Sequence, residues 1–379
     1  VVGEFVRNLD GFRFSQDKGT GVAEAKTIKT AALQALAPQF HLRADRFYNA
    51  PDTEIDYTEQ GGLMWGSSAV GKLVAGADAL KPRVEVFVDD VAGPEVAEKV
   101  QRRLQHFIDR KVAALFEPLL NLGRDEALTG LARGFAFQLV ENMGVLPRSV
   151  VANEVKALDQ DARGALRKHG IRFGQFTIFM PLLLKPAATR LRLVLWSLNK
   201  GLDIFPESPP PGLVTIPAEK GVTEGADTMS GYRIAGERAI RIDMLERLAD
   251  MLRSEDSRGG FEAKADMLSI TGMTLEQFAD LMQGLGYKGE KGERAKVTAA
   301  PAGAPVEAVS DAPVAEAAPV ETADPETPVA EAEVEVFYTF TWARAPRANT
   351  RPARASEKPS GEGRGKGKPK GKPRGANKG

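Results

Sequence analysis

The C-terminal part of this chain can contribute little to a hydrophobic core, and this limits the possible fold more than any other feature. Nine acidic residues and no Lys or Arg lie between Val297 and Val336, whereas twelve Lys or Arg and two Glu lie between Ala343 and Gly379. Both segments are rich in Ala, Pro or Gly, so neither can bury enough surface to offset the entropy of ordering. We therefore predict an acidic disordered linker over 291–332 and a basic disordered tail over 343–379.

The remaining sequence has the composition of a folded protein and offers few metal-binding side chains. Of 379 residues, 42% are hydrophobic, which allows a substantial core in two or three units. The absence of Cys excludes disulfides and zinc–thiolate sites. The three His lie far apart in the sequence, which argues against a His-based metal site. No cofactor is therefore expected in this chain.

The sequence shows neither a membrane segment nor a secretion signal. It has no run of about 18 apolar residues, and its N-terminus lacks the basic-then-apolar pattern of a signal peptide. We expect a cytoplasmic protein with no membrane partner. The chain starts without Met, in a stretch typical of a strand, so we expect it to be part of a longer protein.

Hydrophobic periodicity predicts an α+β fold that is mainly α. A partly helical lead-in segment (1–53) is expected to end a preceding domain. It is followed by a small β module (54–92), a helical accessory domain (93–205), a Pro-rich linker (206–232) and a small helix-turn-helix-like unit (233–290). A short aromatic strand over 333–342 separates the acidic linker from the basic tail. In the lead-in segment, a helix over 20–37 is expected to be closed by Pro38.

Two helices of the accessory domain have clear signals. Pro94 suits the first position of a long helix. A second helix is expected to carry an apolar stripe made of Leu128, Leu131, Phe135, Leu139 and Met143. Further along, IRFGQFTIFM is typical of extended backbone and ATRLRLVLWSL of another helix.

The stretch GSSAVGKL, from Gly66 to Leu73, matches a phosphate-binding loop at every position but the last. Leu73 replaces the hydroxyl that would hold a metal ion. A phosphate loop must also lead directly into a helix, whereas Gly76 and Pro82 follow here. We therefore predict a β-hairpin with Ser67 and Ser68 at its turn.

Five basic residues cluster on the helix predicted to begin at Pro94: Lys99, Arg102, Arg103, Arg110 and Lys111. Such charges are commonly the solvated face of a helix, and contact with nucleic acid is the alternative interpretation. We treat this basic face as a secondary candidate site for nucleic acid.

The helix-turn-helix-like unit carries strong capping signals. Asp243 is expected to cap one helix, and Thr274 with Gln277 forms the capping box of the last one. That last helix exposes Glu276 and Asp280 but no Lys or Arg to neutralise phosphates. We therefore expect it to pack against the rest of the protein rather than to read the major groove.

The stretch EVEVFYTFTW alternates apolar and polar residues between the two charged segments and predicts a short strand. Two roles are open for it. It either docks on the folded part and fixes the start of the tail, or it presents Tyr338 or Trp342 for stacking on unpaired bases. Such stacking is worth about 1–3 kcal/mol per base.

A family resemblance rests on four stretches: ARGFAFQLVENMGVLPR, LDQDARGALRKHGIRFGQFTIFMPLLLKP, RLRLVLWSL and VFYTFTW. Together they resemble the C-terminal half of alphaproteobacterial helicase proteins, which are similar to the mitochondrial degradosome RNA helicase of superfamily two. The resemblance covers most of residues 1–290 and Val336 to Trp342. It implies an ATP-driven helicase for RNA or DNA, in which two RecA-like motor domains precede this region.

The motor itself has no counterpart in this sequence. It contains no credible Walker A loop, no DExH box and no arginine motif of the Q-x-x-G-R-x-G-R kind. ATP and Mg²⁺ are therefore expected only in the motor domains that the resemblance implies. We expect this chain to be inactive as an ATPase on its own.

A Gly-spaced basic tail is suited to capturing phosphate backbones of any sequence, and in a helicase it would raise the local concentration of nucleic acid. The expected partner is nucleic acid, and single-stranded RNA in the first place. The candidate contacts are Trp342, Arg344, Arg347, Arg351, Arg354, Lys358, Arg364, Lys366, Lys368, Lys370, Lys372, Arg374 and Lys378. The alternative is an interaction scaffold whose tail binds an acidic protein or its own acidic linker. A free-standing enzyme is not expected, because no nucleophile with a base can be nominated.

Overall fold

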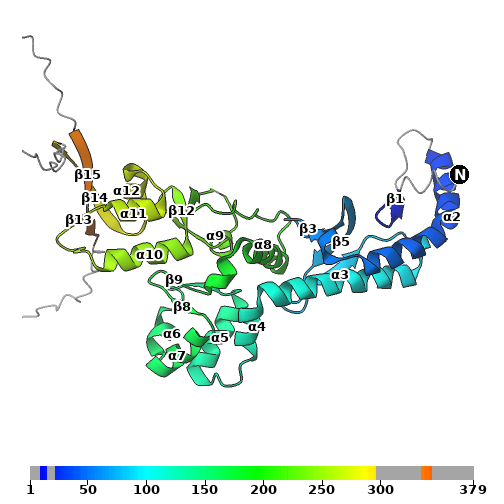
Figure 1. Cartoon of the computed structure of the whole chain (residues 1–379), viewed down its shortest axis with the longest axis horizontal. Helices are drawn as coiled ribbons and strands as arrows, with labels where there is room; N and C mark the ends of the chain where they lie inside the picture. The colour runs from blue at the N-terminus through cyan, green and yellow to red at the C-terminus, as the bar shows by residue number, and fades with distance from the viewer. Residues whose placement is uncertain (1–8, 15–21, 220, 296–333, 344–379) are drawn as a thin grey trace, which may run out of the picture. The chain divides into compact units, whose positions relative to one another are not determined.

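The computed structural model describes residues 9–14, 22–219, 221–295 and 334–343, and it has an α+β fold that is mainly α (Figure 1). The predictions for the tail from Arg344 onward and for residues 296–333 fall outside this part of the chain. Two large hydrophobic clusters form the core. One extends from Phe12 to Met229 and the other from Ala235 to Phe340.

A long helix and a small sheet begin the structure. Helix α2 (Val22–Asn49) lies beside helix α3 (Pro94–Leu115) (Figure 1). An antiparallel sheet has the order β3 (Ile55–Tyr57), β4 (Gly62–Trp65), β5 (Ser68–Val74) and β6 (Arg83–Val86), and a separate pair is formed by β1 (Leu9–Asp10) and β2 (Arg13–Phe14). Short 3₁₀ turns span Asp52–Glu54 and Asp90–Ala92.

The prediction that Pro38 closes the first helix is wrong, because Pro38 lies inside α2 and the helix continues to Asn49. An interior proline loses one backbone hydrogen bond and costs about 3 kcal/mol. Beyond it, Phe40, Ala44 and Phe47 recur at helical spacing and are almost fully buried. Burial of this face stabilises the helix by more than the proline costs.

The β-hairpin predicted for the GSSAVGKL stretch is present. Trp65 pairs with Ser68, so the turn is Gly66–Ser67, one residue earlier than predicted. Gly66 has a φ of 57°, which is the conformation that a two-residue hairpin needs at its first turn residue. Gly71 lies in β5, and a Cβ there would come within 2.7 Å of the Glu85 carbonyl oxygen on the next strand. Gly71 therefore allows two strands to pack closely, and it does not belong to a phosphate-binding loop.

Helices and a small sheet make up the accessory domain. The helices are α4 (Glu117–Arg124), α5 (Gly130–Glu141), α6 (Ala152–Ala157), α7 (Gln160–Lys168) and α8 (Pro186–Lys200). The sheet has the order β7 (Val145–Pro147), β9 (Thr177–Phe179) and β8 (Arg172–Phe173), and a 3₁₀ turn spans Pro181–Leu184. Every residue from Leu191 to Ser197 is buried, so α8 is a central helix rather than an amphipathic surface helix.

The apolar stripe predicted for α5 is correct except at one position. Leu128, Phe135, Leu139 and Met143 are buried, whereas Leu131 is 62% exposed. The helix begins at Gly130, and its buried face takes the spacing 128, 132, 135, 139, so Ala132 occupies the place predicted for Leu131.

The predicted Pro-rich linker over 206–232 is wrong in its second half, which belongs to a sheet and a helix. Strand β10 (Thr215–Pro217) pairs with β12 (Arg238–Arg241), which also pairs with β11 (Tyr232–Ala235), and the short helix α9 spans Ala226–Met229. The hydroxyl of Tyr232 donates to the carbonyl of Leu213 at 2.6 Å. A three-residue strand gives little sequence signal, because its partner strand supplies the hydrogen bonds.

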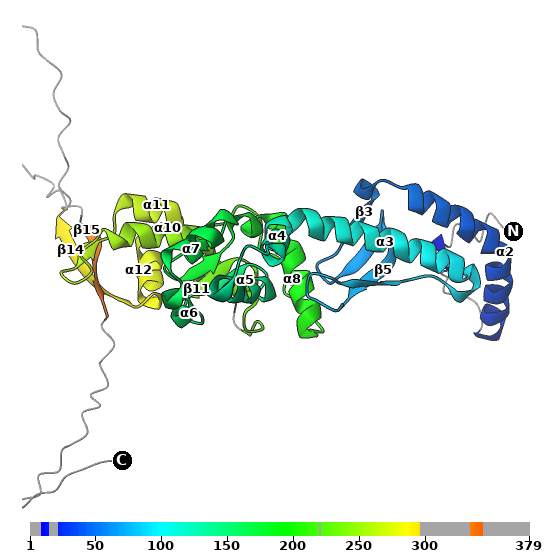
Figure 2. The same ribbon diagram turned by 90° about the horizontal axis from the view of Figure 1, so that it is seen from below.

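The last folded unit has the connectivity of a winged helix-turn-helix (Figure 2). Its elements are α10 (Ile242–Arg253), β13 (Phe261–Glu262), α11 (Ala265–Thr271), α12 (Leu275–Gly284), β14 (Tyr287–Ala295) and β15 (Val334–Trp342). The sheet order is β13-β15-β14. Thr274 and Gln277 form the predicted capping box of α12. Asp243 does not cap α10, because it lies inside the helix and accepts a hydrogen bond from Arg241 instead.

Strand β14 corrects the predicted start of the acidic linker, because residues 291–295 belong to this strand. Its sequence, YKGEKGERA, has no apolar alternation, and β15 supplies the pairing that holds it extended. Ala295 pairs with Val334. The acidic segment therefore connects two paired strands of one hairpin, and it does not join the folded part to the tail.

A buried carboxylate connects α10 to the turn between β8 and β9. Glu246 is 9% exposed, and its carboxylate accepts from the backbone N–H groups of Phe176 at 2.9 Å and Thr177 at 2.7 Å. It accepts a third hydrogen bond from the backbone of Gln175. Burial raises the pKa of Glu246, and this effect is larger than the opposite effect of the three backbone donors.

Candidate nucleic-acid interface

The predicted basic face of α3 is largely occupied by contacts within the protein. Arg103 is 5% exposed and donates to the carbonyl of Ala50 and to Oδ1 of Asp52, both at 2.7 Å. Asp52 also pairs with Arg110 at 2.8 Å. The prediction that Arg103 contacts nucleic acid is therefore wrong, because its guanidinium is buried and holds the segment after α2 against α3.

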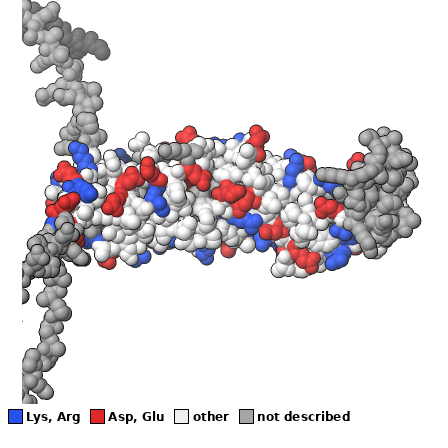
Figure 3. Space-filling view, turned by 90° about the horizontal axis from the view of Figure 1, so that it is seen from above, with Lys and Arg blue, Asp and Glu red and all other residues white. Residues whose placement is uncertain are grey.

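The other residues of this face differ in how far they are engaged. Lys99 pairs with Asp45, and Lys111 lies 5.4 Å from the centre of the Phe107 ring. Arg102 is exposed and lines a cavity of about 460 Å³ whose wall also carries Glu98 and Asp109. With carboxylates interspersed among its bases, this face is a weak attractor for a polyanion. Figure 3 shows the same mixture of Lys or Arg with Asp or Glu on the side of the molecule that it displays.

The strand predicted for EVEVFYTFTW docks on the folded part. Phe340 in β15 is fully buried against Phe261 and Phe278, with ring centres 5.9 and 5.7 Å apart. Tyr338 is half-buried and stacks on Phe340 with an interplanar angle of 13°. These contacts confirm that the strand belongs to the core of the winged unit, and they engage Tyr338 within the protein.

The end of β15 is fixed where the basic tail begins. The N–H of Trp342 donates to the carbonyl of Ser257 at 2.8 Å, and the N–H of Ala343 donates to Gly286 at 3.0 Å. The Trp342 indole packs edge-on against Tyr287 at 4.8 Å between ring centres and stays 47% exposed. Of the candidate nucleic-acid contacts, Trp342 alone is described, since those from Arg344 to Lys378 lie outside the described residues.

Helix α12 is used for packing, as its lack of basic residues predicted. Asp280 accepts from the backbone N–H of Glu237 at 2.7 Å. A Cβ on Gly284 would come within 2.8 Å of Ala235, so this end of the helix touches the turn between β11 and β12. The face that would enter a major groove in other helix-turn-helix proteins is therefore in part covered here.

A second basic site, which the sequence did not indicate, lies between α2 and the hairpin tip. A pocket of about 480 Å³ is lined by Arg43 and Arg46 from α2, by Trp65 at the end of β4 and by the segment Gly66–Ser68 at the hairpin tip, together with Thr53, Glu54 and Asp56. The Cζ atoms of Arg43 and Arg46 lie 5.3 and 5.9 Å from the Trp65 ring centre. Their spacing on α2 places both on one helix face, but only the fold brings the indole to them.

The Trp65 ring is held firmly in this pocket. Its Nε1 donates to Oε2 of Glu54 at 3.0 Å. The ring stacks on Phe12 at 6.2 Å and packs against Phe47 at 5.0 Å. The indole is therefore held in one position, and the guanidinium groups of Arg43 and Arg46 lie over its ring.

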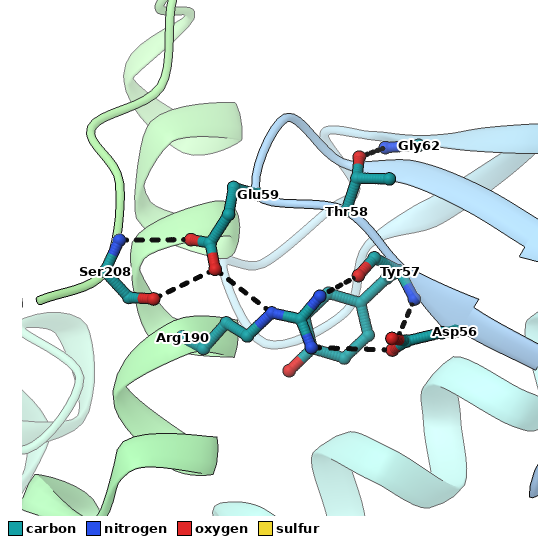
Figure 4. Close-up of polar contacts among 7 residues, drawn as sticks. All are labelled: Asp56, Tyr57, Thr58, Glu59, Gly62, Arg190 and Ser208. Atoms are coloured by element: carbon teal, nitrogen blue, oxygen red, sulfur yellow. Dashed lines mark hydrogen bonds and ion pairs between the residues drawn. The ribbon is translucent and has the colours of Figure 1, made fainter. Parts of the chain in front are cut away.

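A separate polar network joins the first sheet to α8 (Figure 4). Arg190 on α8 contacts Oε1 of Glu59 at 3.1 Å and Oδ1 of Asp56 at 3.5 Å, and its Cζ lies 4.4 Å from the Tyr57 ring centre. Glu59 also accepts from the hydroxyl of Ser208 at 2.9 Å. Burial raises the pKa of Tyr57 to about 12. The carboxylate that faces Ser208 is neutralised by Arg190, so this network fits a structural joint better than a nucleophile with its base.

The described residues contain no group of three or more His, Asp or Glu that could hold a metal ion. Within the same part of the chain, no helix is both long and apolar enough to cross a membrane. Comparison of the sequence and the structure with family models, curated proteins and solved structures gives no significant match.

Proposed function

We propose that this chain is the nucleic-acid-binding accessory region of an ATP-dependent helicase, that its ligand is single-stranded RNA, and that it acts in the cytoplasm. The observation that carries the proposal is the density of charge after the last strand, where twelve Lys or Arg and two Glu lie between Ala343 and Gly379. The sequence resemblance to the C-terminal half of superfamily two helicases supports the helicase part.

The attachment of the tail supports a role in capture. The tail begins at a strand end that is hydrogen-bonded to Ser257 and Gly286, next to the half-exposed Trp342 ring. A polycation attached at a fixed point is confined to a limited volume, which raises its effective concentration for one RNA strand. The indole offers a surface for one base beside those charges.

Capture by point charges predicts a specific dependence on salt. If half of the twelve tail bases neutralise phosphates, the slope of log K against log salt is about −4, from about −0.7 per phosphate on a single strand. Such binding shows no preference for base sequence, because contacts to phosphates do not read base edges.

The test compares RNA binding of the whole chain with two charge-removal variants. One replaces five tail bases with Gln: Lys366, Lys368, Lys370, Lys372 and Arg374. The matched control replaces five exposed lysines of the folded part with Gln: Lys81, Lys156, Lys168, Lys185 and Lys200. We expect the tail variant to flatten the salt slope and to weaken binding to all RNA sequences about equally, and the control to change little.

Two outcomes would refute the proposal. Unchanged RNA affinity and salt slope in the tail variant would show that the tail is not the nucleic-acid site. Displacement of the RNA by a polyglutamate at equal charge concentration would favour the alternative function, a scaffold whose tail binds an acidic protein.

A further inference from the structure

We propose that the pocket formed by Arg43, Arg46, Trp65 and the segment Gly66–Ser68 binds a phosphodiester of single-stranded RNA. The inference rests on the proposed function, because it assigns to the folded part a second contact with the strand that the tail captures. It also locates this contact on residues that the structure describes.

The two guanidinium groups of this pocket are not held in ion pairs among the described residues, although Glu54 and Asp56 also line the pocket. Arg103 and Arg110, by contrast, share the carboxylate of Asp52. Burial lowers the pKa of Arg43, Arg46 lowers it further, and Asp10 opposes this with a smaller effect. A phosphate placed between the two guanidinium groups would remove their mutual repulsion.

Arg43 also has a hydrogen-bond donor that is not used. Its Nε is buried and has no hydrogen-bond partner among the described residues. A buried unpaired donor is destabilising until a phosphate oxygen or a water accepts from it. The planar guanidinium presents paired N–H groups that match phosphate oxygens, so a phosphate is the better partner.

The pocket is preorganised for this ligand. The indole of Trp65 cannot turn easily, because Glu54, Phe12 and Phe47 hold it, and it limits the positions that the two arginines can take. Restricting a rotamer-rich side chain before binding reduces the entropy lost on binding.

The size and the mixed lining of the pocket favour a nucleotide within a chain over a small anion. The volume of about 480 Å³ exceeds what one phosphate fills, and Ser67 and Ser68 line the same space. Glu54 and Asp56 also line the pocket and repel a second phosphate, which limits the pocket to one phosphodiester beside the arginines. Both carboxylates are already engaged, Glu54 by the indole N–H of Trp65 and Asp56 by Arg190.

The experiment measures fluorescence anisotropy of a labelled oligouridylate of about 15 nucleotides, which exceeds the site size of most single-strand binding folds. The Arg43→Gln/Arg46→Gln variant is studied with the natural tail and with the five tail bases replaced by Gln. We expect the affinity to fall about tenfold in both backgrounds and the salt slope to become less steep by about 0.7, the contribution of one phosphate on a single strand.

Control variants, stability measurements and competitors make the result specific. The Arg83→Gln/Arg124→Gln variant removes two exposed arginines of the folded part and should bind RNA like the parent. Arg43→Lys/Arg46→Lys keeps both charges and should retain the salt slope while losing part of the affinity. Thermal unfolding of each variant shows whether the fold is intact. Inorganic phosphate and uridine monophosphate serve as competitors, and we expect both to displace the RNA only at millimolar concentrations.

The outcomes separate this inference from the proposed function. If the Arg43/Arg46 variant folds and binds RNA with the parental affinity and slope while the tail variant does not, the pocket is not a phosphodiester site and the proposed function stands. If the pocket variant loses binding and the tail variant keeps it, the pocket stands and the tail assignment fails. Displacement by micromolar phosphate would overturn the phosphodiester assignment in favour of a small-anion site.

Discussion

Replacement of Phe340 by Ala tests whether β15 is part of the core, and the structure gives the size of the effect. Phe340 is fully buried and contacts the rings of Phe261, Phe278 and Tyr338. Truncation of a buried Phe costs about 3–5 kcal/mol, and part of this cost comes from the lost aromatic pairs. We expect a loss of about 4 kcal/mol in the local stability of the winged unit.

Hydrogen exchange of the β15 peptide is the direct assay. When opening is rapid and reversible, exchange rates follow the free energy of opening. A loss of about 4 kcal/mol therefore corresponds to exchange that is faster by about 10³-fold. Peptides from α3 should change little, because their side chains belong to the other hydrophobic cluster.

Phe337→Ala is the matched control on the same strand. Phe337 is half-buried and pairs with Gly292 on the face away from Phe340, where Arg294 lies 5.0 Å from its ring centre. We expect its truncation to cost about 1 kcal/mol or less. Equal exchange rates in the two variants would refute the conclusion that Phe340 anchors the strand.

Three further outcomes follow from the structure. The chain should show no nucleic-acid-stimulated ATPase activity, and Lys72→Ala should leave that result unchanged. The reason is that Lys72 lies in a strand and pairs with Glu85 at 3.3 Å. ATP turnover that depends on Lys72 would contradict the hairpin interpretation. Deletion of 344–379 should leave the melting temperature nearly unchanged, since this sequence contains no large apolar residue that could join a core; a drop of many degrees in calorimetry would contradict this expectation. Burial raises the pKa of Glu246, so the native state binds the proton of its carboxyl group more tightly than the unfolded state does. The stability therefore falls as the pH rises from 4.5, the ordinary pKa of Glu, through the raised pKa of Glu246. Glu246→Gln should flatten that part of the pH profile in urea unfolding, and a profile as steep as that of the parent would contradict the assignment.

Features encoded within a few residues could be predicted from the sequence. The capping box of α12 involves Thr274 and Gln277, which are three positions apart, and the alternation around Phe340 defines a strand regardless of its partners. The hairpin after Trp65 could also be predicted, but its turn is at Gly66–Ser67 and not at Ser67–Ser68, because the first turn position requires the positive φ that Gly66 provides.

Features that depend on distant partners could not be predicted. Strand β14 carries Lys, Gly and Glu without alternation and is extended because β15 pairs with it. Pro38 is tolerated in α2 because Phe40 and Phe47 pack into the core beyond it. The burial of Arg103 could not be predicted, because the sequence gives no sign that Asp52 and Ala50 surround it. The pocket at Arg43 and Arg46 combines residues of α2 with residues of β3 and of the β4–β5 hairpin, so no local pattern marks it.

The pairing of Ala295 with Val334 determines where the two charged segments are attached. The acidic segment leaves and re-enters the fold at one end of the β14–β15 hairpin, and the tail leaves at the other end, after Trp342. A strand of nine residues places these two attachment points about 27 Å apart, at about 3.4 Å per residue. This distance is more than three times the Debye length of about 8 Å at physiological ionic strength. Strand β15 therefore fixes two attachment points that do not interact electrostatically, and the acidic segment can be lengthened or shortened without moving the point from which the basic tail starts.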